Sequence, residues 1–75
     1  MYIKSQNGQA IVNTECGTIE TNLTDIIFKQ GDKLTVIGTY ENDDAIKIME
    51  RIFFVIDNGQ NTYEMPQEYC NEFYV

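Results

Sequence analysis

The spacing of apolar residues predicts one helix set among short strands. Within Asn42–Gly59, apolar residues recur three or four positions apart, as they do on one face of a helix. Asn42 is expected to cap the first turn, and Gly59 is expected to end the helix in a left-handed conformation. Phe54 lies almost opposite the apolar stripe, so packing of the helix on a sheet does not explain it. The stripe consists of Ala45, Ile48, Met49, Ile52, Phe53 and Ile56.

The first fourteen residues have the pattern of a β-hairpin. Asn7-Gly8 favours a two-residue type I′ turn, because both positions adopt a positive φ in that turn. The register that follows places Ile3 opposite Val12, so these two side chains share a face that can meet the helix. After Cys16-Gly17 we expect a short extended piece over Thr18–Thr21.

The segment Leu23–Tyr40 predicts a second hairpin, turning at Gly31-Asp32 in a type II′ turn. A half-exposed strand alternates apolar and polar residues, and this hairpin does not. It is therefore expected to be covered on both sides, by the helix on one and by the C-terminal tail or a second molecule on the other. One face carries Leu23, Ile27, Leu34, Val36 and Tyr40, and the other carries Ile26, Phe28 and Ile37.

The last strand is predicted at Thr62–Met65, where Pro66 places its end at a sheet edge. Beyond it, Tyr69, Phe73 and Tyr74 have the spacing of a short amphipathic turn. The predicted fold class is α+β: an antiparallel sheet of four to five strands in the order ββββαβ, with one amphipathic helix packed on a face. Residues 1–75 are expected to form a single domain.

Charge narrows the classes of partner. Twelve acidic residues against five basic ones give a net charge of −7, which disfavours direct binding to nucleic acid or to an anionic membrane. The surplus of acidic residues either keeps the protein soluble or forms an acidic surface that binds a basic partner. With no signal peptide and no apolar run of membrane-spanning length, we expect a cytoplasmic protein whose Cys16 and Cys70 are free thiols. A contact between the two cysteines stays open, because the C-terminal tail can pack beside the first loop.

The residues needed for catalysis are scarce. The chain contains no histidine, which removes the commonest general base and the commonest metal ligand. Glu41, Asp43 and Asp44 form the densest acidic patch, but carboxylates at a helix start complement the helix dipole without any metal. No glycine-rich phosphate loop is present. We therefore expect no catalytic, cofactor-binding or metal-binding residues, and no enzyme.

Apolar residues are in surplus for a chain of 75 residues. One interpretation is that the surplus groups cover one another, with the tail folded back over the sheet or the helix. The other is an exposed patch that binds a protein partner or a second copy of the chain as a homodimer. The residues concerned are Phe54, Ile26, Phe28, Ile37, Tyr69, Phe73 and Tyr74.

Three segments carry a resemblance to a known group of proteins. They are Met1–Gly8, the passage from Gly38-Thr39-Tyr40-Glu41 to Met49-Glu50-Arg51-Ile52, and Tyr63-Glu64-Met65-Pro66. The chain resembles small uncharacterised proteins of Gram-positive bacteria, their phages and mobile elements. It departs from them in having Asn-Asp-Asp where a Ser/Thr-Glu-Glu helix cap is usual. The resemblance implies a phage or mobile-element origin and no catalytic residues.

Three functions remain open at this point. The first is a non-enzymatic protein-binding accessory module, such as a phage-borne inhibitor of a host protein. The second is an acidic decoy that mimics nucleic acid and blocks a host defence nuclease, as anti-CRISPR or anti-restriction proteins do. The third is a purely structural, self-associating subunit.

Overall fold

A computed structural model describes residues 1–41 and 43–68. The elements confirm the predicted α+β class. In chain order they are β1 (Tyr2–Lys4), β2 (Ile11–Asn13), the 3-10 helix η1 (Thr14–Cys16), β3 (Thr18–Asn22), β4 (Asp25–Gln30), β5 (Lys33–Thr39), α1 (Asp44–Asp57) and β6 (Thr62–Glu64).

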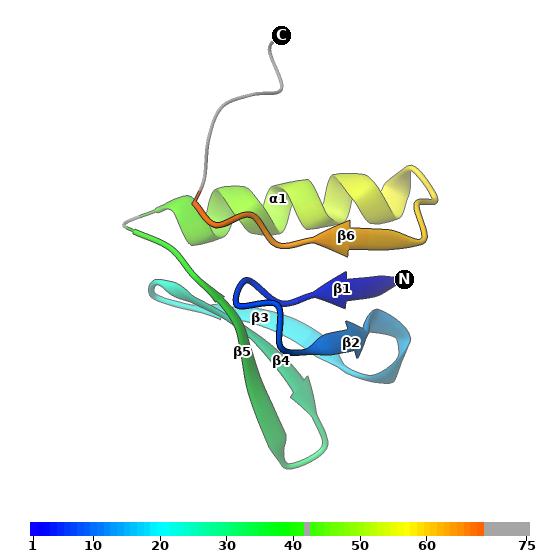
Figure 1. Ribbon diagram of the computed structural model, residues 1–75, viewed down its shortest axis with the longest axis horizontal. Coiled ribbons are helices and arrows are strands. Elements are labelled where there is room, and N and C mark those ends of the chain that lie inside the picture. Colours follow the sequence, from blue (N-terminus) through cyan, green and yellow to red (C-terminus); the bar gives the residue numbers. More distant parts are fainter. Residues whose placement is uncertain (42, 69–75) are drawn as a thin grey trace, which may run out of the picture.

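The strands form two three-stranded sheets, so the prediction of one sheet in the order ββββαβ is wrong (Figure 1). The first sheet has the order β2-β1-β6, with β2 antiparallel and β6 parallel to β1. The second is the antiparallel series β3-β4-β5. The expected extended piece is a full strand, β3, and the last strand pairs with β1 at the other end of the chain. Such a long-range pairing leaves no trace in local periodicity.

The first hairpin has the predicted register but a different turn. Ile3 pairs with Val12 as expected. The turn is closed by the Gly8 N–H, which donates to the Ser5 carbonyl at 2.9 Å. Gly8 has a φ of +74° and Asn7 does not share that region, so the type I′ prediction is wrong. Instead, the Asn7 carboxamide oxygen accepts from the backbone N–H of Gln9 at 2.9 Å, which holds the turn through a side chain.

The second hairpin turns at Gly31-Asp32 as predicted, and Gly31 has a φ of +59°. It also contains a β-bulge. Two consecutive residues of β4 pair with Gly38 and Val36, so Ile37 between them has no partner of its own. The extra residue reverses the faces of β5 beyond the bulge. The sequence pattern places Tyr40 on one face with Leu34 and Val36, but in the structure Tyr40 is buried in the core while those two side chains are exposed.

Helix α1 packs across β3 and β4. Its buried stripe is Ala45, Ile48, Ile52 and Val55. The predicted stripe is therefore rotated: Phe53 is 71% exposed and Ile56 is 44% exposed. The expected cap at Asn42 lies outside the described residues.

The helix ends as the sequence predicts. Gly59 has a φ of +72°, and its N–H donates to the carbonyl of Ile56 at 3.0 Å. The N–H of Gln60 donates to the carbonyl of Val55 at 3.2 Å, which completes a Schellman motif.

The core lies between the two sheets and the helix. The side chains of Ile3, Ile26, Ile37 and Ile48 are fully buried. Around them pack further buried groups from both sheets, from the helix and from the segments that follow β5 and β6: Val12, Phe28, Tyr40, Ala45, Ile52 and Met65.

Gln6 joins the two sheets. Its backbone N–H donates to the Ile37 carbonyl at 2.8 Å. Its side-chain amide then pairs with both backbone groups of Thr39, donating to the carbonyl at 3.1 Å and accepting from the N–H at 2.8 Å. The same amide donates to the carbonyl of Gln67 at 2.6 Å, and the Gln67 side chain donates back to the Gln6 carbonyl at 2.7 Å. The Gln6 amide thus extends β5 as a paired strand would.

Candidate functional site: the outer face of the helix

Exposed apolar side chains concentrate on α1. Of the nine large hydrophobic residues exposed within the described part of the chain, four lie on this helix. The other five are spread over the outer faces and turns of the two sheets. The four are Ile46, Phe53, Phe54 and Ile56.

Three of these residues, together with the half-buried Met49, form a second apolar stripe beside the buried one. Each member of this outer stripe follows a buried residue by one position, and successive helical residues are turned by about 100°. The helix therefore has two parallel apolar stripes, of which the sheets cover one. The outer stripe is Ile46, Met49, Phe53 and Ile56.

An acidic row borders the outer stripe on the side away from the buried one. Asp43, Glu50 and Asp57 are spaced seven residues apart, which is close to two helical turns, and all three are exposed. By the same helical period, Phe54 lies beyond this row, so the carboxylates run between two apolar features. The arrangement places negative charge along one edge of an uncovered apolar surface.

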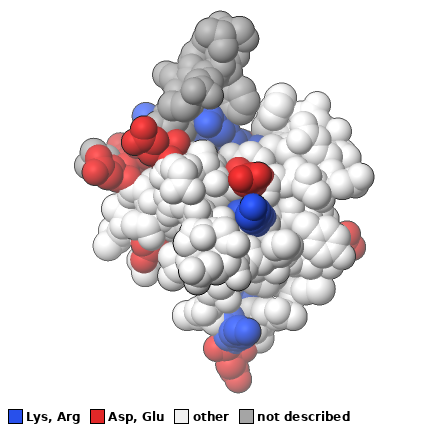
Figure 2. Space-filling view, in the orientation of Figure 1, with Lys and Arg blue, Asp and Glu red and all other residues white. Residues whose placement is uncertain are grey.

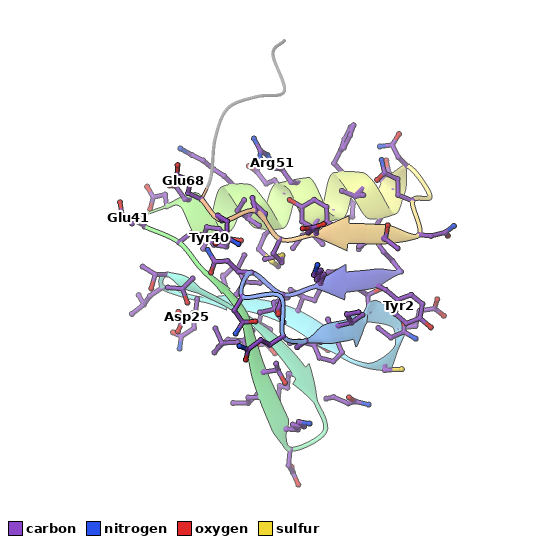
Figure 3. The ribbon with its side chains drawn as sticks, viewed as in Figure 1. Tyr2, Asp25, Tyr40, Glu41, Arg51 and Glu68 are labelled. Carbon is purple, nitrogen blue, oxygen red and sulfur yellow. The ribbon has the colours of Figure 1, made fainter. Side chains whose placement is uncertain are left out.

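The cationic side chains of α1 follow the acidic row around the helix. Lys47 pairs with Asp44 at 3.8 Å. Arg51 projects from the helix (Figure 3) and hydrogen-bonds the side chain of Tyr63 on β6. On the helical wheel both positions lie beyond Phe54, so the acidic row separates them from the outer stripe.

The predicted acidic patch lies at the start of α1. Glu41 and Asp44 line an open hollow together with Glu68, Tyr40, Thr39 and Gln67, while Asp43 is exposed nearby. Figure 3 shows Glu41, Tyr40 and Glu68 at this end of the molecule, and Figure 2 shows acidic atoms gathered there. Across residues 1–41 and 43–68, no three His, Cys, Asp or Glu side chains are grouped closely enough to hold a metal ion.

Among the described residues, the buried Tyr40 and the half-buried Tyr63 have shifted pKa values. Burial raises the pKa of Tyr40 well above its ordinary value, and the nearby Tyr63 adds to the rise. Burial also raises the pKa of Tyr63, against the opposing effect of Arg51. The Tyr40 hydroxyl donates to the Pro66 carbonyl at 2.7 Å. Both hydroxyls are protonated at neutral pH and serve the packing of the core.

The predicted contact residues separate into three groups. Phe54 is 57% exposed, as its position opposite the predicted stripe required. Ile26, Phe28 and Ile37 are buried, so of the two interpretations left open by the sequence, covered or exposed, these three side chains are covered. The bare face of that hairpin is the opposite one, with Leu34 61% and Val36 51% exposed. Tyr69, Phe73 and Tyr74 lie outside the described residues.

Sequence reasoning missed the exposed residues Ile46, Phe53 and Ile56. The predicted stripe includes Phe53 and Ile56, because a helical period alone does not distinguish two adjacent apolar stripes. The available signal was the width of the apolar arc, which is too broad for one sheet to cover.

No family model, curated protein or solved structure matches this chain. Within the described residues, no helix is long and apolar enough to cross a membrane.

Proposed function

We propose that this chain is a non-enzymatic protein-binding module that contacts its partner through the outer face of α1. The observation that carries the proposal is the outer stripe together with Phe54: apolar and aromatic side chains exposed on one regular helix. Phenylalanine side chains bury a large area, and patches that contain them are typical of protein interfaces. A helix anchored by its other stripe presents them in a fixed arrangement.

The biological setting belongs to the same proposal. The resemblance at both ends of the chain supports a phage or mobile-element accessory protein, acting in the cytoplasm as an inhibitor of a host protein. The absence of histidine and the scarcity of reactive groups support a role by binding rather than by catalysis.

Partner capture with paired variants tests the proposal. The immobilised chain is exposed to an extract of the cells that encode it, as wild type, as Phe53→Ser/Phe54→Ser, and as Leu34→Ser/Val36→Ser. Each variant removes two exposed apolar side chains, from α1 or from β5. We expect one partner to be retained by the wild type and the β5 control and lost by the α1 variant. Retention by the α1 variant of every protein that the wild type captures would contradict the proposal.

The acidic decoy is a second candidate, favoured by the carboxylates around the start of α1. Such a decoy binds through charge, so its complex should dissociate steeply as salt rises, and the substitutions Phe53→Ser/Phe54→Ser should leave its binding unchanged.

The structural, self-associating subunit is the third candidate. Light scattering over a range of concentrations separates it from the others, because self-association increases the apparent mass with concentration.

A further inference from the structure

We infer that the partner segment held by the outer stripe is a cationic amphipathic helix. This inference rests on the proposed function and adds the chemistry of the partner to it. It is drawn from the spacing of the outer stripe, from the acidic row beside it, and from the charge of the chain as a whole.

The spacing of the stripe fits a helix. Ile46, Met49, Phe53 and Ile56 follow one another by three, four and three residues, the spacing that packs one helix along another. The stripe spans ten residue steps, or about 15 Å at 1.5 Å per residue. A partner helix of about three turns covers that length.

The acidic row supplies the charge preference. A helix seated on the outer stripe has one flank beside Asp43, Glu50 and Asp57, which are all exposed. Lysine or arginine residues on that flank place their charges near these carboxylates while their aliphatic stems cover the edge of the apolar stripe. Glutamate or aspartate at the same positions meets like charge.

The same row argues against a second copy of this chain as the occupant. In an antiparallel two-fold pair, the outer flank of one helix faces the outer flank of the other, so the two acidic rows oppose each other. A parallel pair instead brings the two acidic helix starts together. Each copy also carries a net charge of −7. Charge complementarity therefore favours a basic partner over self-association.

Synthetic peptides provide the test. The probe is an 18-residue peptide with leucine at helical three-four spacing and lysine on both flanks. One control peptide has glutamate in place of every lysine, and another has the probe's composition in scrambled order. Fluorescence anisotropy measures binding to the full chain, and amide chemical shifts locate the site.

We expect the lysine peptide to bind on α1 at least about tenfold more tightly than either control peptide, and to bind more weakly as salt rises. Glu50→Lys is expected to weaken binding several-fold, whereas Glu20→Lys, the same change on exposed β3, leaves it nearly unchanged. Phe53→Ser is expected to weaken binding more than Leu34→Ser. Circular dichroism verifies that each variant is folded.

Several outcomes would overturn the inference. If the glutamate peptide binds α1 as tightly as the lysine peptide, the helix face binds peptides without a preference for cations. That outcome rejects the inference and leaves the proposed function standing. Equal binding of the scrambled peptide would indicate charge attraction without a helix site. A dimer that Phe53→Ser dissociates would make a second copy the occupant. A probe that fails to bind α1 also rejects the inference, while partner capture judges the proposed function separately.

Discussion

The side chain of Gln6 forms backbone hydrogen bonds of the kind that a neighbouring strand provides elsewhere in the molecule. Its side-chain amide satisfies both backbone groups of Thr39 and also reaches Gln67, so one residue connects the first hairpin, β5 and the segment after β6. Leu23 and Tyr40 are two further residues whose local geometry has consequences for stability. Each of the three supports a prediction.

Replacing Gln6 with alanine removes these side-chain bonds. Because the bonds are solvent-exposed, we expect the free energy of unfolding to fall by about 1–2 kcal/mol rather than by the full value of buried hydrogen bonds. Urea denaturation measures the change. Gln9→Ala, on the same turn, is the control and should have little effect; equal losses in the two variants would refute the role of Gln6.

Leu23 adopts a φ of +58° in the turn between β3 and β4 and is 88% exposed. Leucine is disfavoured in this left-handed region, whereas asparagine tolerates it. Leu23→Asn is therefore expected to raise the free energy of unfolding by about 0.5–1 kcal/mol, since little burial is lost. The control is Leu34→Asn, an exposed leucine within a strand, which should not stabilise the chain. A less stable Leu23→Asn variant would contradict the argument.

The raised pKa of Tyr40 makes the stability of the folded chain depend on alkaline pH. Its pKa is raised in the folded state, so above about pH 10 the unfolded chain loses the hydroxyl proton first. The stabilising contribution is complete below that pH and is lost as pH rises toward the folded-state pKa. We expect urea midpoints to fall above pH 10.

In Tyr40→Phe, the decrease in the urea midpoint above pH 10 should be shallower. At neutral pH the free energy of unfolding of this variant should be lower by about 1 kcal/mol, because the hydrogen bond to the Pro66 carbonyl is lost. Tyr2→Phe, which removes a hydroxyl from a half-exposed ring, serves as the control. Identical alkaline profiles for the wild type and Tyr40→Phe would show that Tyr40 does not cause the fall.

At the scale of the element, α1 illustrates how much of a helix can be inferred from a pattern. Its existence, its length and its stop at Gly59 follow from local signals, because periodicity and a left-handed glycine act within a few residues. The rotation of α1 about its own axis does not follow from local signals. Two apolar stripes lie one residue apart, and only packing against β3 and β4 selects the one that is buried.

Ile52 and Phe53 are adjacent residues that test this rotation. Ile52 is 3% exposed and Phe53 is 71% exposed. We expect Ile52→Ala to lower the free energy of unfolding by about 2–4 kcal/mol, and Phe53→Ala by less than about 1 kcal/mol. Chemical denaturation of the two variants measures the difference. A larger loss for Phe53→Ala would place the predicted stripe, rather than the observed one, against the sheets.

At the scale of the whole molecule, repulsion among the surplus acidic groups lowers the free energy of unfolding. A net charge of −7 on 75 residues produces self-repulsion that salt screens. Raising sodium chloride from 20 to 200 mM is expected to increase the free energy of unfolding by about 0.5–1 kcal/mol. The gain should be smaller in Glu20→Gln/Glu41→Gln, which carries less negative charge. Stability that is unchanged or reduced by salt would indicate that specific ion pairs outweigh the net repulsion.

The sequence by itself determined the fold class, the register of the first hairpin, the Gly31-Asp32 turn and the extent of α1. These features arise from interactions between near neighbours in the chain. Only the tertiary structure decided that β6 pairs with β1, that Ile26, Phe28 and Ile37 are core, and that Phe53 and Ile56 face outward. The bulge at Ile37 changes the face that Tyr40 occupies, and the rotation of α1 exposes Phe53 and Ile56. Neither feature follows from local periodicity, because each depends on how a segment pairs or packs with its neighbours in the fold.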